Sequence, residues 1–264
     1  MSNIIIDPYR FGIDCSSNVI SCTIKPLSFD GTDDELILSD HNDFSFDAVN
    51  NSVDINLSHS VCVYLNRESL FNHDSIYHKG NALNDIEYRI FFLGNDLYCD
   101  TYDTNVSIYS RRVFYNISSS IMSNSTWFQL CVAFGTEAKE VSAWINGTSL
   151  GTGTPGGTSG GDMENLSAAF SIGGALTSGG TNYYEGLLTQ FMLWKDHKLT
   201  QDEVDYLYSS GTALRNPTID CGDYQISNKL KLWVKDETGV DYSGNSHNMT
   251  LTGGLTHSGS SSPC

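Results

Sequence analysis

The feature of this sequence that most limits its fold is a series of short segments in which apolar and polar residues alternate. Residues 53–65 (VDINLSHSVCVYL) show it most clearly, since Val53, Ile55 and Leu57 share one face with polar neighbours between them. A period of two places every second side chain on the same side of an extended chain. The segment is therefore expected to be a strand with one buried face.

Similar segments follow at short intervals, separated by Gly, Asn, Asp and Ser residues that favour turns. Many short strands joined by such turns are typical of an antiparallel sandwich or barrel. The 264 residues are enough for one large all-β domain. We expect further strands near residues 27–29, 35–38, 75–78, 87–93, 97–102, 106–109, 112–117, 127–134, 141–145, 171–174, 184–194, 229–234 and 249–251.

One helix is expected near residues 200–211. Thr200 has Glu203 three positions later, which is the pattern of a capping box at a helix N-terminus. Gly211 is suited to end the helix, because glycine adopts the left-handed conformation at low cost. The chain is thus mainly β, with one short helix late in the sequence.

The charge balance excludes some partners. Lys and Arg number 14 against 31 Asp and Glu, which gives a formal net charge of −17. Such a charge repels phosphate backbones and anionic membrane surfaces, so we expect no nucleic acid partner and no membrane insertion. The first residues, MSNIIIDPYRFG, lack the pattern of a signal peptide. We therefore expect synthesis in a cytosol without a signal peptide.

Five segments, in order, resemble the laminin-G-like domains of the concanavalin A-like lectin/glucanase family. The resemblance covers about residues 27–211 and implies an all-β antiparallel sandwich of the jelly-roll kind. Asn146-Gly147 matches the tight turn of a hairpin in that family. The matching segments are SFDGTDDELIL (28–38), WFQLCVAF (127–134), VSAWINGTSLG (141–151), SIGG (171–174) and EGLLTQFMLW (185–194), followed by the helix.

The sequence departs from that family in two places. Thr189 and Gln190 stand where the family has an acidic pair, which weakens any ligand role of that strand. Residues 233–253 resemble the family's usual first strand but lie near the C-terminus. The expected organisation is an arm (1–26), a jelly roll (27–214) and a strand-bearing extension (215–264). The extension either completes its own sandwich or pairs with a neighbouring subunit.

Catalysis is not expected. Glycoside hydrolases of this fold carry two or three carboxylates on one strand, in a pattern such as E-x-D-x-E. The nearest match, Glu203-Val204-Asp205, lies on the expected helix, and a capping role explains Glu203 better. The His residues show no metal-binding spacing and are interpreted as isolated.

The chain has seven cysteines, an odd number that leaves at least one thiol unpaired. Cys62, Cys99 and Cys131 lie in apolar segments and are interpreted as small core residues. Cys15 and Cys22 flank a short polar stretch and are a possible pair.

Calcium is a candidate cofactor, because relatives that the sequence resembles often bind it at the rim of the sandwich. Asp30, Asp33 and Asp34 gather oxygen ligands in one turn, and Asp241 and Asn245 do so in the extension. The same residue types are also simply common in turns.

Aromatic side chains offer a candidate carbohydrate site. Tyr98, Tyr102, Tyr183 and Tyr184 have the flat apolar faces on which sugar rings stack. Packing within the sheets is the competing explanation for tyrosines in strands.

Two functions follow as hypotheses. The first is a non-catalytic structural protein of a virion or particle, such as a capsid decoration or a tail or fibre component, located on the particle surface and partnered by other subunits of the assembly. The second is a lectin-like module that binds a cell-surface glycan, in which case an extracellular location is expected. Fold alone does not decide between them.

Overall fold

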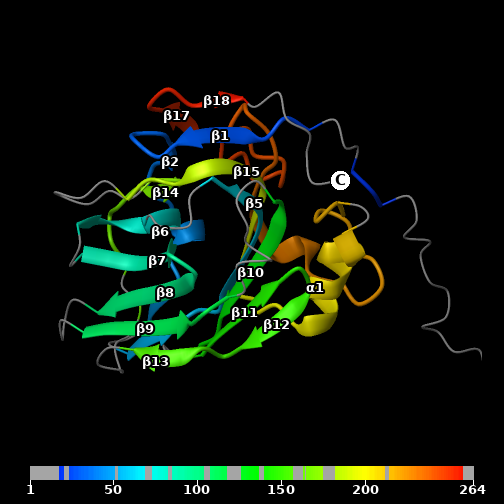
Figure 1. Cartoon of the computed structure of the whole chain (residues 1–264). Coiled ribbons are helices and arrows are strands. Elements are labelled where there is room, and N and C mark those ends of the chain that lie inside the picture. The colour runs from blue at the N-terminus through cyan, green and yellow to red at the C-terminus, as the bar shows by residue number, and fades with distance from the viewer. Residues whose placement is uncertain are drawn as a thin grey trace, which may run out of the picture.

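The computed structural model is a sandwich of two antiparallel sheets (Figure 1). It describes residues 18–20, 24–50, 53–68, 73–82, 85–103, 108–117, 126–136, 140–156, 163, 165–174, 182–211 and 214–257. The expected jelly-roll class is confirmed.

Sheet I contains the long central strands of the fold. Its order is β12-β11-β10-β5-β15-β1-β18, and β16 also pairs with β15. These strands are β1 (Leu27–Asp30), β5 (His59–Arg67), β10 (Phe128–Phe134), β11 (Val141–Ile145), β12 (Thr148–Gly151), β15 (Glu185–Lys195), β16 (Leu230–Val234) and β18 (Thr256–His257).

Sheet II faces sheet I across the core. Its order is β13-β9-β8-β7-β6-β14-β2-β17, and a separate hairpin is formed by β3 and β4. These strands are β2 (Glu35–Leu38), β3 (Asp47–Asn50), β4 (Val53–Asn56), β6 (His73–Ala82), β7 (Asp85–Leu93), β8 (Asp96–Asp103), β9 (Ile108–Phe114), β13 (Thr154–Gly156), β14 (Phe170–Ile172) and β17 (Thr250–Thr252).

Helical structure is limited among the described residues to one α-helix and three short 3-10 turns. The helix α1 (Gln201–Tyr208) begins with the expected capping box, since Thr200 and Glu203 bond reciprocally at its N-terminus. The 3-10 turns are η2 (Asn42–Phe44), η3 (Ser209–Gly211) and η4 (Ser227–Lys229). No described helix has the length and apolar character needed to cross a membrane.

The expected strand 53–65 is two strands. The chain leaves β4 after Asn56 and enters β5 at His59, because β4 pairs with β3 while β5 joins sheet I. The two segments expected at 106–109 and 112–117 are instead the single strand β9. Period-two alternation continues through such changes, so it finds strands but not their ends.

Two hydrophobic clusters hold the molecule together. The first lies between the sheets, where Leu65, Phe92 and Phe191 are fully buried. The second lies on the outer face of sheet I, where Trp194 packs with Val204 of α1 and with residues of the C-terminal extension. The central strands of sheet I are therefore buried on both faces, and every residue of β5 and β10 is buried.

The C-terminal extension adds strands to both sheets. Its β16 pairs with β15. Its β17 pairs with β2, and its β18 pairs with β1 (Figure 1). The Trp233 indole N–H donates to Gln190 Oε1 at 2.7 Å, and the Thr189 hydroxyl donates to the Lys235 carbonyl at 2.6 Å. The two residues that replace the family's acidic pair therefore attach the extension to the sandwich.

A disulfide joins β5 and β10. Cys62 and Cys131 are opposite each other in the register of these strands and are bonded, while Cys99 is a free buried thiol. Interpreting Cys62 and Cys131 as unbonded core residues is therefore wrong, because the sequence does not show which residues face each other across a sheet. Cys221 is also disulfide-bonded, and the candidate Cys15–Cys22 pair lies outside the described residues.

Buried charges occur inside the sandwich. Lys79 and Glu87 are fully buried and form an ion pair, and Lys79 Nζ also donates to Ser45 Oγ at 2.7 Å and to the Leu166 carbonyl at 3.0 Å. A buried charge is tolerated only when it is paired and hydrogen-bonded in this way. The pair thus ties β6 and β7 to the loops that carry Ser45 and Leu166.

Candidate functional site

The outer face of sheet II carries the described candidate binding site. Alternation along β7 turns Tyr88, Ile90 and Phe92 into the core and leaves Arg89 and Phe91 on the other side. Along β8 the same alternation leaves Tyr98 and Asp100 on that outer side. The period of two thus aligns apolar rings and charged groups on adjacent strands.

Phe91 and Tyr98 form the aromatic part of this site. Their rings stack with centroids 4.9 Å apart and planes inclined by 10°. The Arg89 guanidinium lies 4.8 Å from the Phe91 centroid, and the Arg111 guanidinium lies 5.2 Å from the Tyr98 centroid. Each ring is thereby paired with a planar cation, an arrangement that holds all four side chains in place.

Asp100 fixes the two arginines. Its buried carboxylate accepts from Arg89 Nε at 2.9 Å and from Arg111 Nε and Nη2 at 2.6 and 2.7 Å. A bidentate guanidinium–carboxylate contact has a fixed geometry. Two guanidinium groups thus meet one carboxylate on this face.

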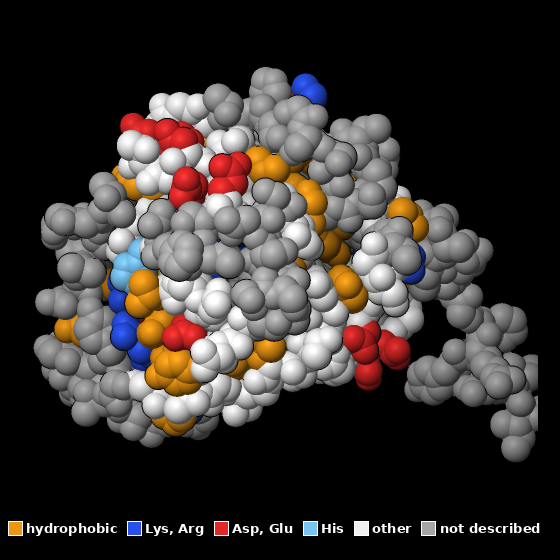
Figure 2. Space-filling view, viewed as in Figure 1, with side chains coloured by type: hydrophobic (Ala, Val, Ile, Leu, Met, Phe, Trp, Pro, Cys, Tyr) orange, Lys and Arg blue, Asp and Glu red, His pale blue; other side chains and the backbone are white. Residues whose placement is uncertain are grey.

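A small hollow continues the site toward β6. It is lined by His73, Ser75, Arg89, Phe91 and Asn182. In the space-filling view, a His lies beside basic and hydrophobic side chains over the left part of β6–β9 (Figure 2). Burial lowers the pKa of His73, despite a hydrogen bond with Asn182 that raises it. The imidazole is therefore neutral at pH 7 and can both donate and accept hydrogen bonds.

The four tyrosines expected to bind sugar lie in different environments. Tyr98 belongs to the outer face of sheet II, and Tyr183 is half-buried beside Glu35 and Asp33, whose charges add to burial in raising its pKa. Tyr102 is buried. Tyr184 is fully buried, contacts Phe29 edge to face and donates its hydroxyl to the Leu187 carbonyl. A sugar-stacking role is therefore corrected to a packing role for Tyr102 and Tyr184.

Sequence reasoning missed most of the residues at the outer face of sheet II. The charged and aromatic residues of β7 and β8 do alternate with core residues, so the signal was present for Arg89, Phe91 and Asp100. Arg111 and Asn182 join the site only through strand pairing and loop placement, which the sequence does not show. Only tyrosines were considered from the sequence as sugar-stacking residues, so Tyr98 was included but not Phe91, which stacks on it.

The acidic turn at Asp30, Asp33 and Asp34 is brought together by the structure. One oxygen from each carboxylate lies within 4.8 Å of the others. Asp34 also holds the turn, since its carboxylate accepts from the backbone N–H groups of Asp30 and Gly254 at 2.9 and 2.7 Å. Burial and the charges of Asp30 and Asp33 raise the pKa of Asp34.

The extension loop uses its polar groups differently. Asp241 accepts four hydrogen bonds: from the backbone N–H groups of Trp233, Ser243 and His247, and from the Ser243 hydroxyl. Asn245 donates its amide to the Leu230 carbonyl at 2.9 Å. The side chains of Asp241 and Asn245 hold the loop on β16, and their calcium role stays a prediction.

Glu203 is occupied with structure rather than chemistry. Its Oε2 accepts from the Thr200 backbone N–H and lies 2.8 Å from His197 Nε2. Burial raises the pKa of Glu203, but the bonds from His197 and Thr200 outweigh it and hold the pKa below its usual value. The carboxylate is therefore an ionised helix cap.

Comparisons with known proteins agree with this architecture. A family model described as the concanavalin A-like lectin/glucanases superfamily matches residues 30–205. A search of curated proteins finds no match.

Two solved structures are similar to the chain at low sequence identity. A candidate carbohydrate-binding protein of Bacteroides ovatus is 12% identical, with a TM-score of 0.53 over 90% of this chain and 61% of that one. The heptameric pentraxin of Limulus polyphemus is 13% identical, with a TM-score of 0.49 over 90% and 96% of the two chains. This chain thus spans less than two thirds of the length of the first.

Proposed function

Because the chain belongs to the concanavalin A-like lectin/glucanases superfamily, we propose that it is a non-catalytic module that binds carbohydrate on the outer face of sheet II. The observation that carries this proposal is the cluster of Arg89, Phe91, Tyr98, Asp100 and Arg111. Sugars present both apolar C–H faces and hydroxyl groups, so they are recognised by aromatic surfaces beside fixed hydrogen-bond donors. The Bacteroides protein of similar fold is itself a candidate carbohydrate-binding protein.

The absence of catalysis is part of the same proposal. The acid pattern of glycoside hydrolases has its nearest match at Glu203, which caps α1. In the candidate site both oxygens of the Asp100 carboxylate already accept hydrogen bonds from two guanidinium groups, so neither is free to serve as the acid or base of hydrolysis. The site is suited to hold a ligand rather than to cleave one.

The local charge adds a preference among sugars. Arg89 and Arg111 exceed Asp100 by one positive charge, and the rest of the chain is strongly acidic. A glycan that carries a carboxylate would gain a charge-assisted hydrogen bond to a guanidinium group. We therefore propose that glycans with acidic sugars bind more tightly than neutral ones.

A glycan array tests the proposal. We expect the full chain to bind a subset of glycans, and Tyr98→Ala to weaken binding at least tenfold, which corresponds to about 1.4 kcal/mol. Tyr208→Ala is the matched control, since Tyr208 lies on α1 at the opposite side of the molecule. Equal binding by the Tyr98 and Tyr208 variants would place the site elsewhere, and no binding by the full chain to any glycan would remove the proposal.

A structural role in a virion or other particle is a second proposal. What favours it is that β12 and β13, of four and three residues, are the outermost strands at one end of the two sheets and lie near each other (Figure 1). Edges of this kind can pair with another subunit. This role would be favoured if the chain binds no glycan on the array but is present in purified particles.

The expected location of the protein depends on which of the two proposed functions it has. A particle surface suits the assembly role, and an extracellular position suits the lectin role. The Cys62–Cys131 disulfide favours surroundings outside a reducing cytosol in either case.

We also propose that Asp30, Asp33 and Asp34 bind calcium at the rim of the sandwich. Three carboxylate oxygens within 4.8 Å of one another supply part of the oxygen shell that calcium requires. Calcium is expected to raise the melting temperature and EGTA to reverse the effect, since a ligand of the folded state stabilises it. Asp33→Asn should abolish the response, while Asp202→Asn on α1 should keep it. A melting temperature that does not change with calcium would contradict the proposal.

A further inference from the structure

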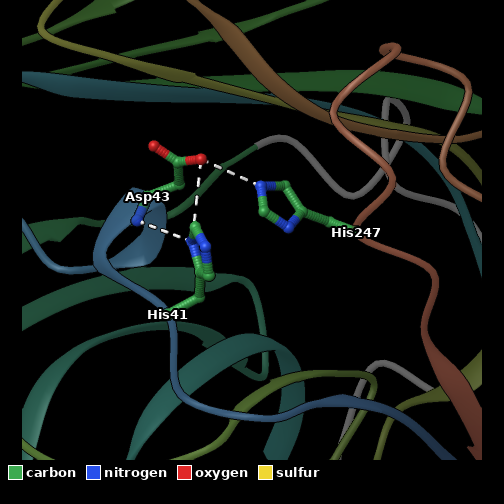
Figure 3. A group of neighbouring side chains, drawn as sticks. All are labelled: His41, Asp43 and His247. Carbon is green, nitrogen blue, oxygen red and sulfur yellow. Dashed lines mark hydrogen bonds and ion pairs between the residues drawn. The ribbon is translucent and has the colours of Figure 1, made fainter.

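Two histidines and an aspartate from distant parts of the chain meet where the C-terminal extension contacts η2. His41 precedes η2, Asp43 lies within it, and His247 lies in the loop that follows β16. The three side chains point toward one another (Figure 3). None of them belongs to the proposed carbohydrate site.

The distances in this cluster suit a metal ion. Asp43 Oδ2 lies 2.9 Å from His247 Nε2 and 3.6 Å from His41 Nδ1. One ligand atom from each residue lies within 4.8 Å of the other two. Two ligands bound tetrahedrally to zinc at about 2.0–2.1 Å lie about 3.3 Å apart. Small adjustments would therefore bring all three atoms to one ion.

The kinds of ligand select the ion. Two imidazole nitrogens and one carboxylate oxygen match the preference of zinc and its neighbours in the first transition row. Calcium and magnesium prefer oxygen ligands, so the two imidazoles argue against them. We propose that His41, Asp43 and His247 bind a zinc ion that fastens the C-terminal extension to η2.

The surroundings leave the cluster open on one side. The His41 side chain is 50% exposed, that of Asp43 28% and that of His247 10%. Water can therefore reach the site and supply a fourth ligand. Phe44 packs against the His247 ring, with centroids 5.0 Å apart, and so limits the movement of the more buried imidazole.

Other groups contact the cluster and compete with the ion. The backbone N–H of Asp43 donates to His41 Nδ1 at 3.1 Å, so zinc would have to displace this bond. Lys231 Nζ lies 3.6 Å from Asp43 Oδ1, the carboxylate oxygen that does not face His247, and Lys195 donates to the Asn42 carbonyl. Zinc would therefore displace only one hydrogen bond, on the exposed His41 ring. Lys231 contacts Asp43 Oδ1 and leaves Oδ2, the oxygen that faces both imidazoles, accessible to the ion.

The Asp43 carboxylate already contacts both histidines and a lysine, so ligand exchange would occur among groups that meet at this point. On binding, zinc would take the place of the proton that His247 Nε2 shares with Asp43. The site would then connect residues about 200 positions apart in the chain.

The test uses the full chain, freed of metal by dialysis against a chelator. Isothermal titration with zinc chloride should show one site, and zinc at a hundredfold excess over its Kd should raise the melting temperature by about 5 °C or more. Cobalt chloride, which takes similar ligands, should give a visible absorption band of a tetrahedral site. Any rise in melting temperature with calcium chloride should be the same in the full chain and in His41→Gln, because the proposed calcium site is the turn of Asp30, Asp33 and Asp34.

Variants locate the ion. His41→Gln and Asp43→Asn should each weaken zinc binding at least tenfold, and both should fold, since these side chains are not fully buried. His197→Gln is the matched control, because His197 also bonds a carboxylate but has no third ligand near it among the described residues. Zinc binding that is absent in the full chain, or equal in all three variants, would overturn the proposal. Loss of zinc binding leaves the glycan proposal untouched, since the two sites share no residue.

Discussion

A chain that ends at Lys229 is expected to be insoluble or largely unfolded. The deletion removes β16, β17 and β18, which pair with β15, β2 and β1. It would remove Leu232 and Val234, which are fully buried, and uncover the apolar residues of the core that pack against them. Strand edges would also lose their hydrogen-bond partners. Expression level, gel filtration and circular dichroism would measure the outcome.

Single substitutions in the extension give the same information with less damage. Leu232→Ala should lower the free energy of unfolding by about 2–5 kcal/mol, as is usual for a fully buried leucine. Leu251→Ala in β17 is the matched control, because this side chain is 36% exposed, and its effect should be well under that range. A truncated chain that melts like the full one would show that the pairing of the extension contributes nothing to stability.

The second large effect is expected at the buried pair of Lys79 and Glu87. Lys79→Met should lower the free energy of unfolding by about 3–5 kcal/mol, because it leaves the Glu87 carboxylate buried without its cation. The double variant Lys79→Met with Glu87→Gln should be more stable than Lys79→Met alone. Chemical denaturation of the three variants and the unchanged chain forms a double-mutant cycle.

The pH dependence of Lys79→Met gives a second readout. Burial raises the pKa of Glu87 above its ordinary value of 4.5, and Lys79 opposes that rise. Without Lys79 the folded state therefore holds the Glu87 proton more tightly than the unfolded state does. Its stability is then greatest below pH 4.5 and falls as the pH rises toward the folded pKa. Lys79→Met should thus lose less stability at pH 5 than at pH 8, and an equal loss at both would show that Glu87 does not carry the effect.

The fold could be predicted from local patterns because every strand of a sandwich alternates core-facing and outward-facing side chains. Alternation located most strands, Thr200 and Glu203 located the helix, and Asn146-Gly147 marked the turn between β11 and β12, where both residues have positive φ. The resemblance of residues 233–253 to a first strand anticipated that the extension carries strands. Local patterns did not predict the break between β4 and β5 at residues 57–58. A strand ends where its pairing with a neighbouring strand ends, and the sequence does not show that pairing.

The candidate sites were harder to predict, since they are made by pairing rather than by local sequence. Arg111 meets Asp100 because β9 lies beside β8, and His247 meets Asp43 because the extension folds back over η2. Neither contact leaves a spacing in the sequence. The acidic turn at Asp30, Asp33 and Asp34 was found correctly as a cluster because its residues are neighbours in the chain.

The burial of β5 on both of its faces gives the two sheets unequal mutational freedom. A polar substitution at Val61, Val63 or Leu65 would place an unsatisfied group between the sheets, and one at Cys62 would place it beneath α1 and the extension. The outer face of sheet II carries no such double constraint, since Arg89 and Tyr98 are only partly buried. Descendants of this sequence could therefore vary the proposed carbohydrate site through residues of β7, β8 and β9 while inheriting the same buried central strands.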